Sequence, residues 1–520
     1  MTPVELEVTR HALDGVADEM GVALRRAAYS PNIKERIDCS AAVFDTVGNM
    51  VAQAEHIPVH LGSMPASVTA ALEAMGGELP PGTQIAVNDP YAGGTHLPDL
   101  TLVEGVYDDA GRLLGYVANR AHHADVGGAA PGSMPADATD IAQEGIRIPP
   151  LVVADAEGPR EDVLRLIAAN SRTPDERRGD LRAQFAANHV GARRLRELAA
   201  RWGPEGLARA CVEVCDYSDR RVRAAVTAFP DGAYGFTDVM ELGPLGEPEI
   251  RVVVTIRGDH VVADFAGTAG QVPANVNAVY AVTLSATWFV FRMLTDPDAP
   301  PNAGAYRALE VRAPKGSLVH AVHPAPVAAG NVETSQRIVD VLLGAFAQAL
   351  PDRVPAASQG TMNNLLIGAS GGTAAFSYYE TIGGGEGGTP FRAGMSGVHT
   401  GMTNTRNTPA EAMELDYPLR VWRAQLRPGS GGAGRHPGGD GIVREVEALT
   451  EATLTLQTER RARGPWGLSG GEDGAPGRNL LIHADGSEEA LAAKGTWTLA
   501  AGDRIRVETP GGGGWGATQS

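Results

Sequence analysis

The chain has 520 residues, of which 43% are hydrophobic and 20% charged, and its 44 Lys and Arg against 62 Asp and Glu give a net charge of −18. This length corresponds to about two to four domains. The acidic excess argues against nucleic acid or an anionic membrane as the main partner. The 65 Gly and 35 Pro follow no period and alternate with apolar runs, which excludes a collagen-like or disordered chain and favours many tight turns.

The sequence favours a cytoplasmic protein. Its N-terminal stretch lacks the basic start and apolar segment of a secretory signal. No apolar run reaches the roughly 18 residues of a membrane helix, because the stretch 279–293 is short and contains Arg292. Three Cys, an odd and sparse number, argue against a disulfide framework and fit a reducing compartment. Cys211 and Cys215 are interpreted as two buried thiols on one helix face rather than a metal or redox pair.

Helical and strand patterns alternate through the first 230 residues. Residues 5–28 carry apolar side chains at helical spacing, and Pro65 is a start signal for a helix over 66–75. The turn at 47–49 separates two β-rich runs, as in a hairpin. The predicted strands are 37–44, 50–54, 84–87, 100–107 and 113–119, and the further predicted helices are 161–170, 181–200 and 204–227.

Beyond residue 230 the pattern turns to short β-like runs interrupted by one helix. The expected strands are 251–256, 260–265, 442–449 and 452–457, and the expected helix is 338–348. We therefore predict an α+β fold, a multi-domain mixed α/β chain that is β-rich and Gly-rich toward its C-terminus. Shifts in composition divide it into an N-terminal α/β domain with the candidate metal loops (1–230), a middle α+β segment (231–355) and a Gly-rich, β-rich C-terminal segment (356–520).

Two loops at the ends of predicted strands combine imidazole and carboxylate groups. Loops on a rigid scaffold are where sites concentrate, and mixed His and Asp ligands suit Zn, Mn or Fe(II) with positions open for water or substrate. Flanking glycines allow the backbone to approach a ligand closely. The candidates are Asp89, His96 and Asp99 in the loop 88–99, and His122, His123 and Asp125 in the segment 119–128.

The same pattern has a structural interpretation, and spacing alone leaves both open. Asp often caps turns, and a His-x-x-Asp spacing arises by chance. Neighbours on an extended strand point to opposite faces, so at most one of His122 and His123 would face a metal. Asp38 could face a site or be an exposed or salt-bridged acid, while His56 and His60 lie in an apolar setting typical of structural histidines.

Other catalytic signatures are weak. The sequence has no Walker-type Gly-Lys-Ser/Thr loop, and its Gly-rich runs do not clearly join a strand to a helix. The segment Gly429–Gly441 could wrap a ligand, with Arg435 reading an anion, or be an ordered turn system. Gly-x-Ser-x-Gly strings occur at Ser370 and Ser469 without a convincing following helix, which disfavours a covalent serine hydrolase.

Long motifs throughout the chain resemble the hydantoinase B / 5-oxoprolinase family. That family includes the B subunit of ATP-dependent N-methylhydantoinase, the C-terminal half of 5-oxoprolinase, the caprolactamase β subunit and a subunit of acetone carboxylase. One departure is Cys39, where the family often has Phe. The matching stretches include AQAEHIPVHLGSM, NDPYAGGTHLPDLT, ANRAHHADVGG, HPAPVAAGNVETSQRIVD, RPGSGGAGRHPGGDGIVRE and TPGGGGWG.

The resemblance implies a division of labour between two subunits. A partner, the hydantoinase A-type subunit, binds ATP and phosphorylates the amide or lactam oxygen of a small cyclic amide. The B-type subunit holds a divalent metal (Mn, Zn or Fe) where the activated ring is hydrolysed. This chain would then be part of a hetero-oligomeric, ATP-dependent hydrolase acting on a hydantoin, 5-oxoproline or lactam ring.

The resemblance also assigns roles by position. The expected metal ligands are Asp38, His96, His122, His123 and Asp125. Asp99 and Asp89 would orient ligands or act as the base toward water, and His56 and His60 would contact substrate. Two alternatives are a subunit of an ATP-dependent ketone carboxylase, and a non-catalytic scaffold for an A-type partner. The intact His96, His122 and Asp125 argue against the scaffold.

Overall fold

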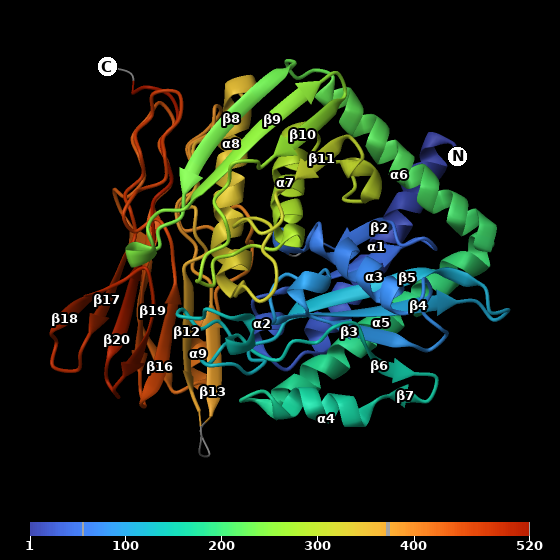
Figure 1. Cartoon of the computed structure of the whole chain (residues 1–520), viewed down its shortest axis with the longest axis horizontal. Coiled ribbons are helices and arrows are strands. Elements are labelled where there is room, and N and C mark those ends of the chain that lie inside the picture. The colour runs from blue at the N-terminus through green and yellow to red at the C-terminus, as the bar shows by residue number, and fades with distance from the viewer. Residues whose placement is uncertain (55–56, 371–374, 519–520) are drawn as a thin grey trace.

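A computed structural model describes residues 1–54, 57–370 and 375–518. Helices and four β-sheets are combined in one chain, with the N-terminal part on one side and the C-terminal sheets on the other (Figure 1). The predicted α+β class is confirmed. Within the described ranges, none of the helices combines the length and apolar character needed to span a bilayer.

A seven-stranded antiparallel sheet forms the centre of the N-terminal part, in the order β2-β1-β5-β4-β3-β6-β7. Alternate residues of each strand serve two cores: Ala41 and Val43 pack with the long helices, while Ala42 and Phe44 pack with Met64 of the short helix on the opposite face. The strands are β1 (Cys39–Phe44), β2 (Met50–Ala54), β3 (Gln84–Val87), β4 (Asp99–Tyr107), β5 (Leu113–His122), β6 (Leu151–Asp155) and β7 (Gly158–Pro159). Strands buried on both faces make this sheet a rigid platform.

Helices cover both faces of this sheet. Helices α1 and α5 pack against each other and against β1, β4 and β5, and α3 lies against β3, β4 and β5. The helices are α1 (Pro3–Ala27), α2 (Pro31–Lys34), α3 (Ser63–Ala74), α4 (Glu161–Ala169), α5 (Pro174–Trp202) and α6 (Pro204–Val226), with short 3₁₀ turns η1 (Pro58–His60), η2 (Pro90–Ala92) and η3 (Ile141–Gln143).

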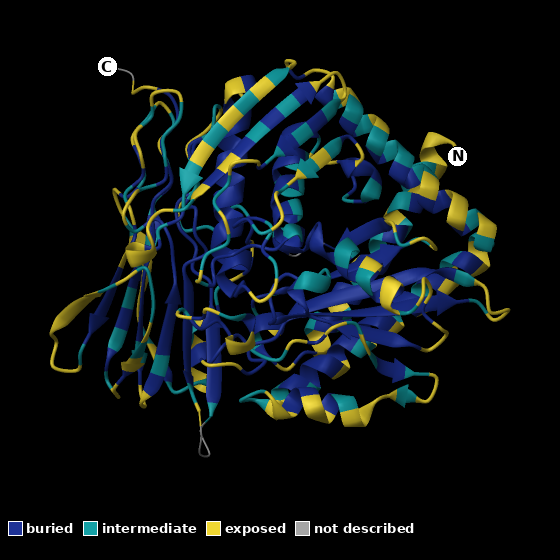
Figure 2. Cartoon of the chain, viewed as in Figure 1, coloured by how far each residue is buried: buried dark blue, intermediate teal, exposed yellow. Residues whose placement is uncertain are grey.

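A four-stranded sheet and two apolar helices form the middle of the chain. Its strand order is β11-β10-β9-β8, and α8 packs beneath β8 and β9 and beside α7 (Figure 1). The elements are β8 (Gly232–Val239), β9 (Glu249–Arg257), β10 (His260–Asp264), α7 (Tyr280–Thr295), β11 (Leu309–Arg312) and α8 (Ser335–Ala349), with η4 (Gly243–Leu245), η5 (Ala303–Tyr306) and a π-helical turn η6 (Gly330–Thr334). Figure 2 shows α8 as almost wholly buried, unlike the outward-facing α4 and α6.

Two antiparallel sheets pack face to face in the C-terminal part, with orders β13-β12-β16-β19 and β14-β15-β20-β17-β18. One apolar core joins them, with Leu365 and Leu454 from the first sheet and Val446 and Ile505 from the second. The elements are β12 (Asn364–Ala369), β13 (Phe376–Glu380), α9 (Ala410–Asp416), β14 (Leu419–Arg427), β15 (Gly441–Ala448), β16 (Ala452–Gln457), β17 (Arg478–Ile482), β18 (Glu488–Leu491), β19 (Lys494–Leu499) and β20 (Arg504–Glu508).

Extended Gly-rich segments pack backbone against backbone beside this sandwich. We call residues 383–388, 429–441, 464–474 and 509–516 the glycine bundle. Gly512 N–H donates to Gly439 O at 2.9 Å, and Gly388 N–H donates to Gly513 O at 2.8 Å. A Cβ on Gly438 would lie 1.9 Å from Gly512 O, and one on Gly512 would lie 2.0 Å from Glu386 O. Only glycine fits at these approaches, which accounts for part of the unusual composition.

Most predicted elements agree with the observed ones to within a few residues, including the hairpin β1–β2, the strand β3 and the strand β16. The helix expected at 181–200 begins earlier, at Pro174, because Pro at the first helical position and the acidic Asp175 and Glu176 in the first turn favour a helix start there. The helix expected at 338–348 begins at Ser335 and continues the π-turn. The domain limits at 230 and 355 stay a prediction.

Candidate metal centre

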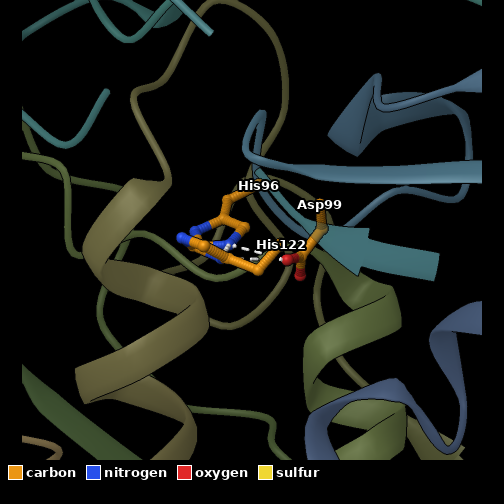
Figure 3. A group of neighbouring side chains, drawn as sticks. All are labelled: His96, Asp99 and His122. Atoms are coloured by element: carbon orange, nitrogen blue, oxygen red, sulfur yellow. Dashed lines mark hydrogen bonds and ion pairs between the residues drawn. The ribbon is translucent and has the colours of Figure 1, made fainter. Parts of the chain in front are cut away.

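Three side chains meet where β4 begins and β5 ends. Asp99 is the first residue of β4, and the antiparallel register places it opposite His122, the last residue of β5. His96 lies three residues before Asp99, in the turn that leads into β4. His96 Nε2 and His122 Nδ1 each lie 3.2 Å from Asp99 Oδ1, and 3.2 Å from each other (Figure 3). All three side chains are buried.

The surrounding backbone fixes the orientation of His96. Its Nδ1 lies 3.2 Å from Ala328 O, which can only accept, so Nδ1 carries the ring proton. In the neutral ring, the lone pair is then on Nε2, directed at Asp99 and His122. A lone pair facing a carboxylate is unfavourable unless a proton or a cation lies between them. This arrangement therefore favours a positively charged occupant.

A second group shares Asp99 with the first. His60, at the end of η1, places Nε2 3.4 Å from Asp99 Oδ2, and its Nδ1 is 2.9 Å from Ser40 Oγ. Asp38 immediately precedes β1, and its carbonyl accepts the His122 N–H at 3.0 Å. Ligand atoms of Asp38, His60 and Asp99 all lie within 4.8 Å of one another. Strand β1 pairs with β5, and this pairing brings Asp38 beside His122.

Several buried polar atoms here have no hydrogen-bond partner among the described residues. They include Nε2 of His60, Nε2 of His122 and Oδ1 of Asn331. The carboxylate of Asp38, whose residue is only 7% exposed, makes no hydrogen bond or ion pair within that part of the chain. Unsatisfied buried polar atoms are costly and call for a bound group.

The donor set and its spacing fit a divalent metal. Imidazole and carboxylate ligands suit Zn, Mn or Fe(II). Metal–ligand bonds of about 2.1 Å place neighbouring ligand atoms about 3.0–3.4 Å apart for octahedral or tetrahedral angles, and the observed separations of 3.2 Å agree. His96, Asp99 and His122 fit as a core set, with Asp38 beside them.

The protonation states of Asp99 and His122 also suit the binding of a metal ion. Burial would raise the pKa of the Asp99 carboxyl, but the neighbouring imidazoles of His96, His122 and His60 hold that pKa well below its usual range. Burial lowers the pKa of His122, although Asp38 and Asp99 oppose this effect. An ionised Asp99 and a neutral His122 are the forms that bind metals.

The other expected site residues lie elsewhere. His123 turns away from His122, as neighbours on a strand do, and its Nε2 is 2.9 Å from Gln184 Oε1. Asp125 accepts hydrogen bonds from Arg172 Nη1 at 2.9 Å and from nearby backbone N–H groups. Asp89 caps η2 and lies 3.6 Å from Arg147. His56 lies outside the described residues. The structure therefore brings together Asp38, His60, His96, Asp99 and His122 and not His123, Asp125 or Asp89.

Sequence reasoning missed residues that come from distant parts of the chain. Asn331, in the π-turn η6, places Nδ2 3.4 Å from Asp99 Oδ2. The Tyr379 ring stacks on His122 with centroids 4.8 Å apart, and the Arg36 guanidinium lies 4.5 Å from the centre of that ring. Asn331 lies inside a motif that the family resemblance uses, which was the available signal, whereas nothing in the sequence singles out Tyr379.

These features define the class of the protein: an α+β chain with a buried His/Asp cluster of metal-binding chemistry at the rim of an antiparallel sheet. The chain belongs to the family described as Hydantoinase B/oxoprolinase, whose sequence model matches residues 2–518.

Related proteins match along almost the whole chain. An uncharacterized protein of Methanocaldococcus jannaschii is 41% identical, over 99% of this chain and 91% of the relative. The 5-oxoprolinase 1 of Arabidopsis thaliana is 39% identical over 99% of this chain, which spans only 42% of that longer protein. The crystal structure of ATP-dependent caprolactamase from Pseudomonas jessenii matches with a TM-score of 0.92 and 30% identity, over 99% of this chain and 91% of that chain.

Proposed function

We propose that this chain is the B-type subunit of an ATP-dependent cyclic amidohydrolase. It opens a hydantoin, 5-oxoproline or lactam ring that a partner A-type subunit activates by phosphorylation. The observation that carries the proposal is the buried cluster of His96, Asp99 and His122, with Asp38 beside it. Two of the relatives support the proposal, since one is named a 5-oxoprolinase and the other an ATP-dependent caprolactamase.

His96, Asp99 and His122 would hold the divalent metal, and Asp38 is the fourth candidate ligand. When bound, such an ion supplies Lewis-acid activation of water and of the reacting carbonyl at neutral pH. Thr95 Oγ1 donates to Asp99 Oδ2 at 2.6 Å and fixes the rotation of the carboxylate. Tyr379 and the buried strands shield the cluster from bulk water, which strengthens every electrostatic interaction inside it.

The need for ATP follows from the substrate class. An unstrained amide ring hydrolyses slowly at neutral pH, and phosphorylation of its oxygen makes the ring carbon electrophilic and supplies a leaving group. The sequence has no Walker-type phosphate loop, and we therefore place the ATP-binding site on the partner subunit. This chain spans 42% of the 5-oxoprolinase relative, so the rest of that longer polypeptide is long enough to contain an ATP-binding part.

The test is reconstitution with a purified A-type subunit. Purified pairs would be supplied with ATP and a panel of hydantoin, 5-oxoproline and caprolactam, and ring opening and ADP release would be measured. We expect one ring to be opened with coupled ADP release. His96→Ala should abolish ring opening while the pair still assembles on size exclusion, and His11→Ala, an exposed histidine, should leave it unchanged.

Two results would contradict the proposal. Normal ring opening by His96→Ala would remove the cluster from the chemistry. ATP-dependent incorporation of labelled bicarbonate into a ketone, without opening of any ring, would instead identify a carboxylase subunit.

A further inference from the structure

The metal cluster itself lines a very small cavity. This cavity has a volume of about 20 Å³ and is bounded by Asp38, His60, Asp99, His122 and Asn331. A volume of this size holds about one water molecule or one ion. A five- to seven-membered ring therefore does not fit beside the cluster, and the body of the substrate needs space elsewhere.

A larger cavity lies between α7, α8 and the segment 386–401. We call it the α7–α8 cavity, and its volume is about 570 Å³. Small-molecule sites typically measure about 300–1,000 Å³. Helices α7 and α8 lie side by side and supply two of its walls (Figure 1).

The same two segments of the chain border both cavities, at different residues. Along the run η6–α8, Asn331 and Val332 line the cluster cavity, and Gln336 and Val339 line the α7–α8 cavity. Asn331 and Gln336 are five residues apart, which is about 7 Å along a helix. On the opposite wall, residues 398–401 line the larger cavity, and Thr403 and Thr405 line the smaller one.

One side chain of the larger cavity, Gln336, is bonded to the segment that borders both cavities. Gln336 Nε2 donates to Thr400 O at 2.9 Å, and Gln336 Oε1 accepts from the Met402 N–H at 3.4 Å. A Cβ on Gly401 would lie 2.1 Å from Gln336 Oε1, so glycine is what allows this close contact.

The chemistry of the larger cavity is mainly apolar with one unsatisfied polar group. Phe289, Met293, Leu343 and Phe391 supply apolar surface from three sides. Neither ring nitrogen of His399 has a hydrogen-bond partner among the described residues. Burial, helped by the charge of Arg36, lowers the pKa of His399 to about 4, against weaker opposing effects of the neighbouring Asn407 amide and the charge of Glu380. A neutral imidazole offers one donor and one acceptor, which complements the N–H and C=O edge of a cyclic amide.

We propose that the α7–α8 cavity is the substrate-ring site and that it selects cyclic amides with an apolar ring substituent. His399 binds the amide edge, and the apolar walls bind the substituent. This inference rests on the proposed function.

The test uses calorimetric titration of the full chain loaded with Mn²⁺. The probes are 5-benzylhydantoin and unsubstituted hydantoin. We expect the benzyl compound to bind at least about tenfold more tightly, as added apolar groups do in a matching pocket. Leu343→Trp and Met293→Trp fill the cavity from two adjacent helices and should reduce the preference to about threefold or less. Leu415→Trp, at a residue 85% exposed, should retain it.

The result that would overturn the inference is equal or absent binding of the two probes, or a preference that survives both filling variants. Thermal unfolding of each variant checks its fold. The two substitutions are on different helices, so the test can still be made if one of the variants does not fold. Binding preference without ring opening in the reconstituted pair would leave this inference standing and remove the proposed function. Ring opening without the binding preference would support the proposed function and remove this inference.

Discussion

Asp99 presents its two carboxylate oxygens to different neighbours. Oδ1 faces His96 and His122, while Oδ2 accepts from Thr95 and faces His60. It is therefore the one member common to both groups of candidate ligands. Loss of its charge would affect every other side chain of the cluster.

Asp99→Asn should weaken the binding of Mn²⁺ or Zn²⁺ by about 100-fold or more, because loss of a ligand exceeds the 10–100-fold cost of losing an outer partner. Metal content after dialysis, measured by elemental analysis, gives the result. The matched control is Asp89→Asn, which removes a carboxylate from the capped turn η2 outside the cluster and should retain the metal. Equal metal content in the two variants would exclude Asp99 as a ligand.

At the residue scale, sequence could indicate part of the cluster. Local spacing pointed to His96, His122 and His123, and of the last two the structure places only His122 beside Asp99, since neighbours on a strand point to opposite faces. Asp125 was expected near them because it is close in sequence, but it pairs with Arg172 instead. The contribution of Asn331 depends on packing across more than 200 residues, which no local pattern encodes.

The π-turn η6 carries a buried acid with an unusual environment. Glu333 Oε1 accepts from the Met362 N–H and from Asn364, while its Oε2 has no partner among the described residues. Burial raises the pKa of Glu333 to about 8, against smaller opposing effects that begin with the charge of Lys494. The neutral acid is therefore the stable form in the folded protein at neutral pH.

Glu333→Gln should remove a pH dependence of stability. The folded pKa lies above the unfolded one, so the stabilisation is complete below about pH 4.5 and is lost as the pH rises toward about 8. The wild type should lose on the order of a few kcal/mol relative to the variant across this window. Melting temperatures of both proteins between pH 5 and pH 8 measure it, and a constant difference over that range would contradict the assignment.

The glycine bundle is an element defined by the absence of side chains. Gly512→Ala should destabilise the protein by roughly 2 kcal/mol or more, because its Cβ would lie 2.0 Å from Glu386 O, and backbone cannot move aside cheaply. Gly15→Ala is the matched control, since no atom lies within 4 Å of its Cβ position in helix α1. That change should stabilise by about 0.5–1 kcal/mol. Chemical denaturation of both variants gives the signs, and destabilisation by both would contradict this explanation.

At the scale of the molecule, the cluster joins segments that are far apart in sequence. Asp38, His60, His96 to Asp99, His122 and Asn331 come from five separate stretches. A ligand that binds only the folded form stabilises it by mass action. A metal bound at this cluster would therefore contribute to the stability of the whole chain.

Removal of metal with a chelator should lower the melting temperature by a few degrees. A ligand at about 100 times its Kd contributes about 2.7 kcal/mol, and a chain of this length has a large unfolding entropy. Addition of Mn²⁺ or Zn²⁺ should restore the original value in the wild type and have no effect on Asp99→Asn. An identical response of that variant would place the stabilising metal elsewhere.

The individual helices and strands could be predicted from the sequence, but the order in which the strands pair could not. Helical spacing and hairpin signals gave the N-terminal elements closely, including the pair β1 and β2. They did not indicate that β5 would lie between β1 and β4, a register that sets Asp38, Asp99 and His122 together. Pairing between distant strands is decided by packing, which short sequence windows do not contain.

The glycine bundle also has a consequence for synthesis. Residues 386–401 form a wall of the α7–α8 cavity, and Gly385 and Gly388 are held by hydrogen bonds to Pro510 and Gly513. The ribosome makes those two partners more than a hundred residues after the wall itself. A nascent chain therefore cannot close this cavity when the wall emerges, and the cavity forms only after the C-terminal segment has been made.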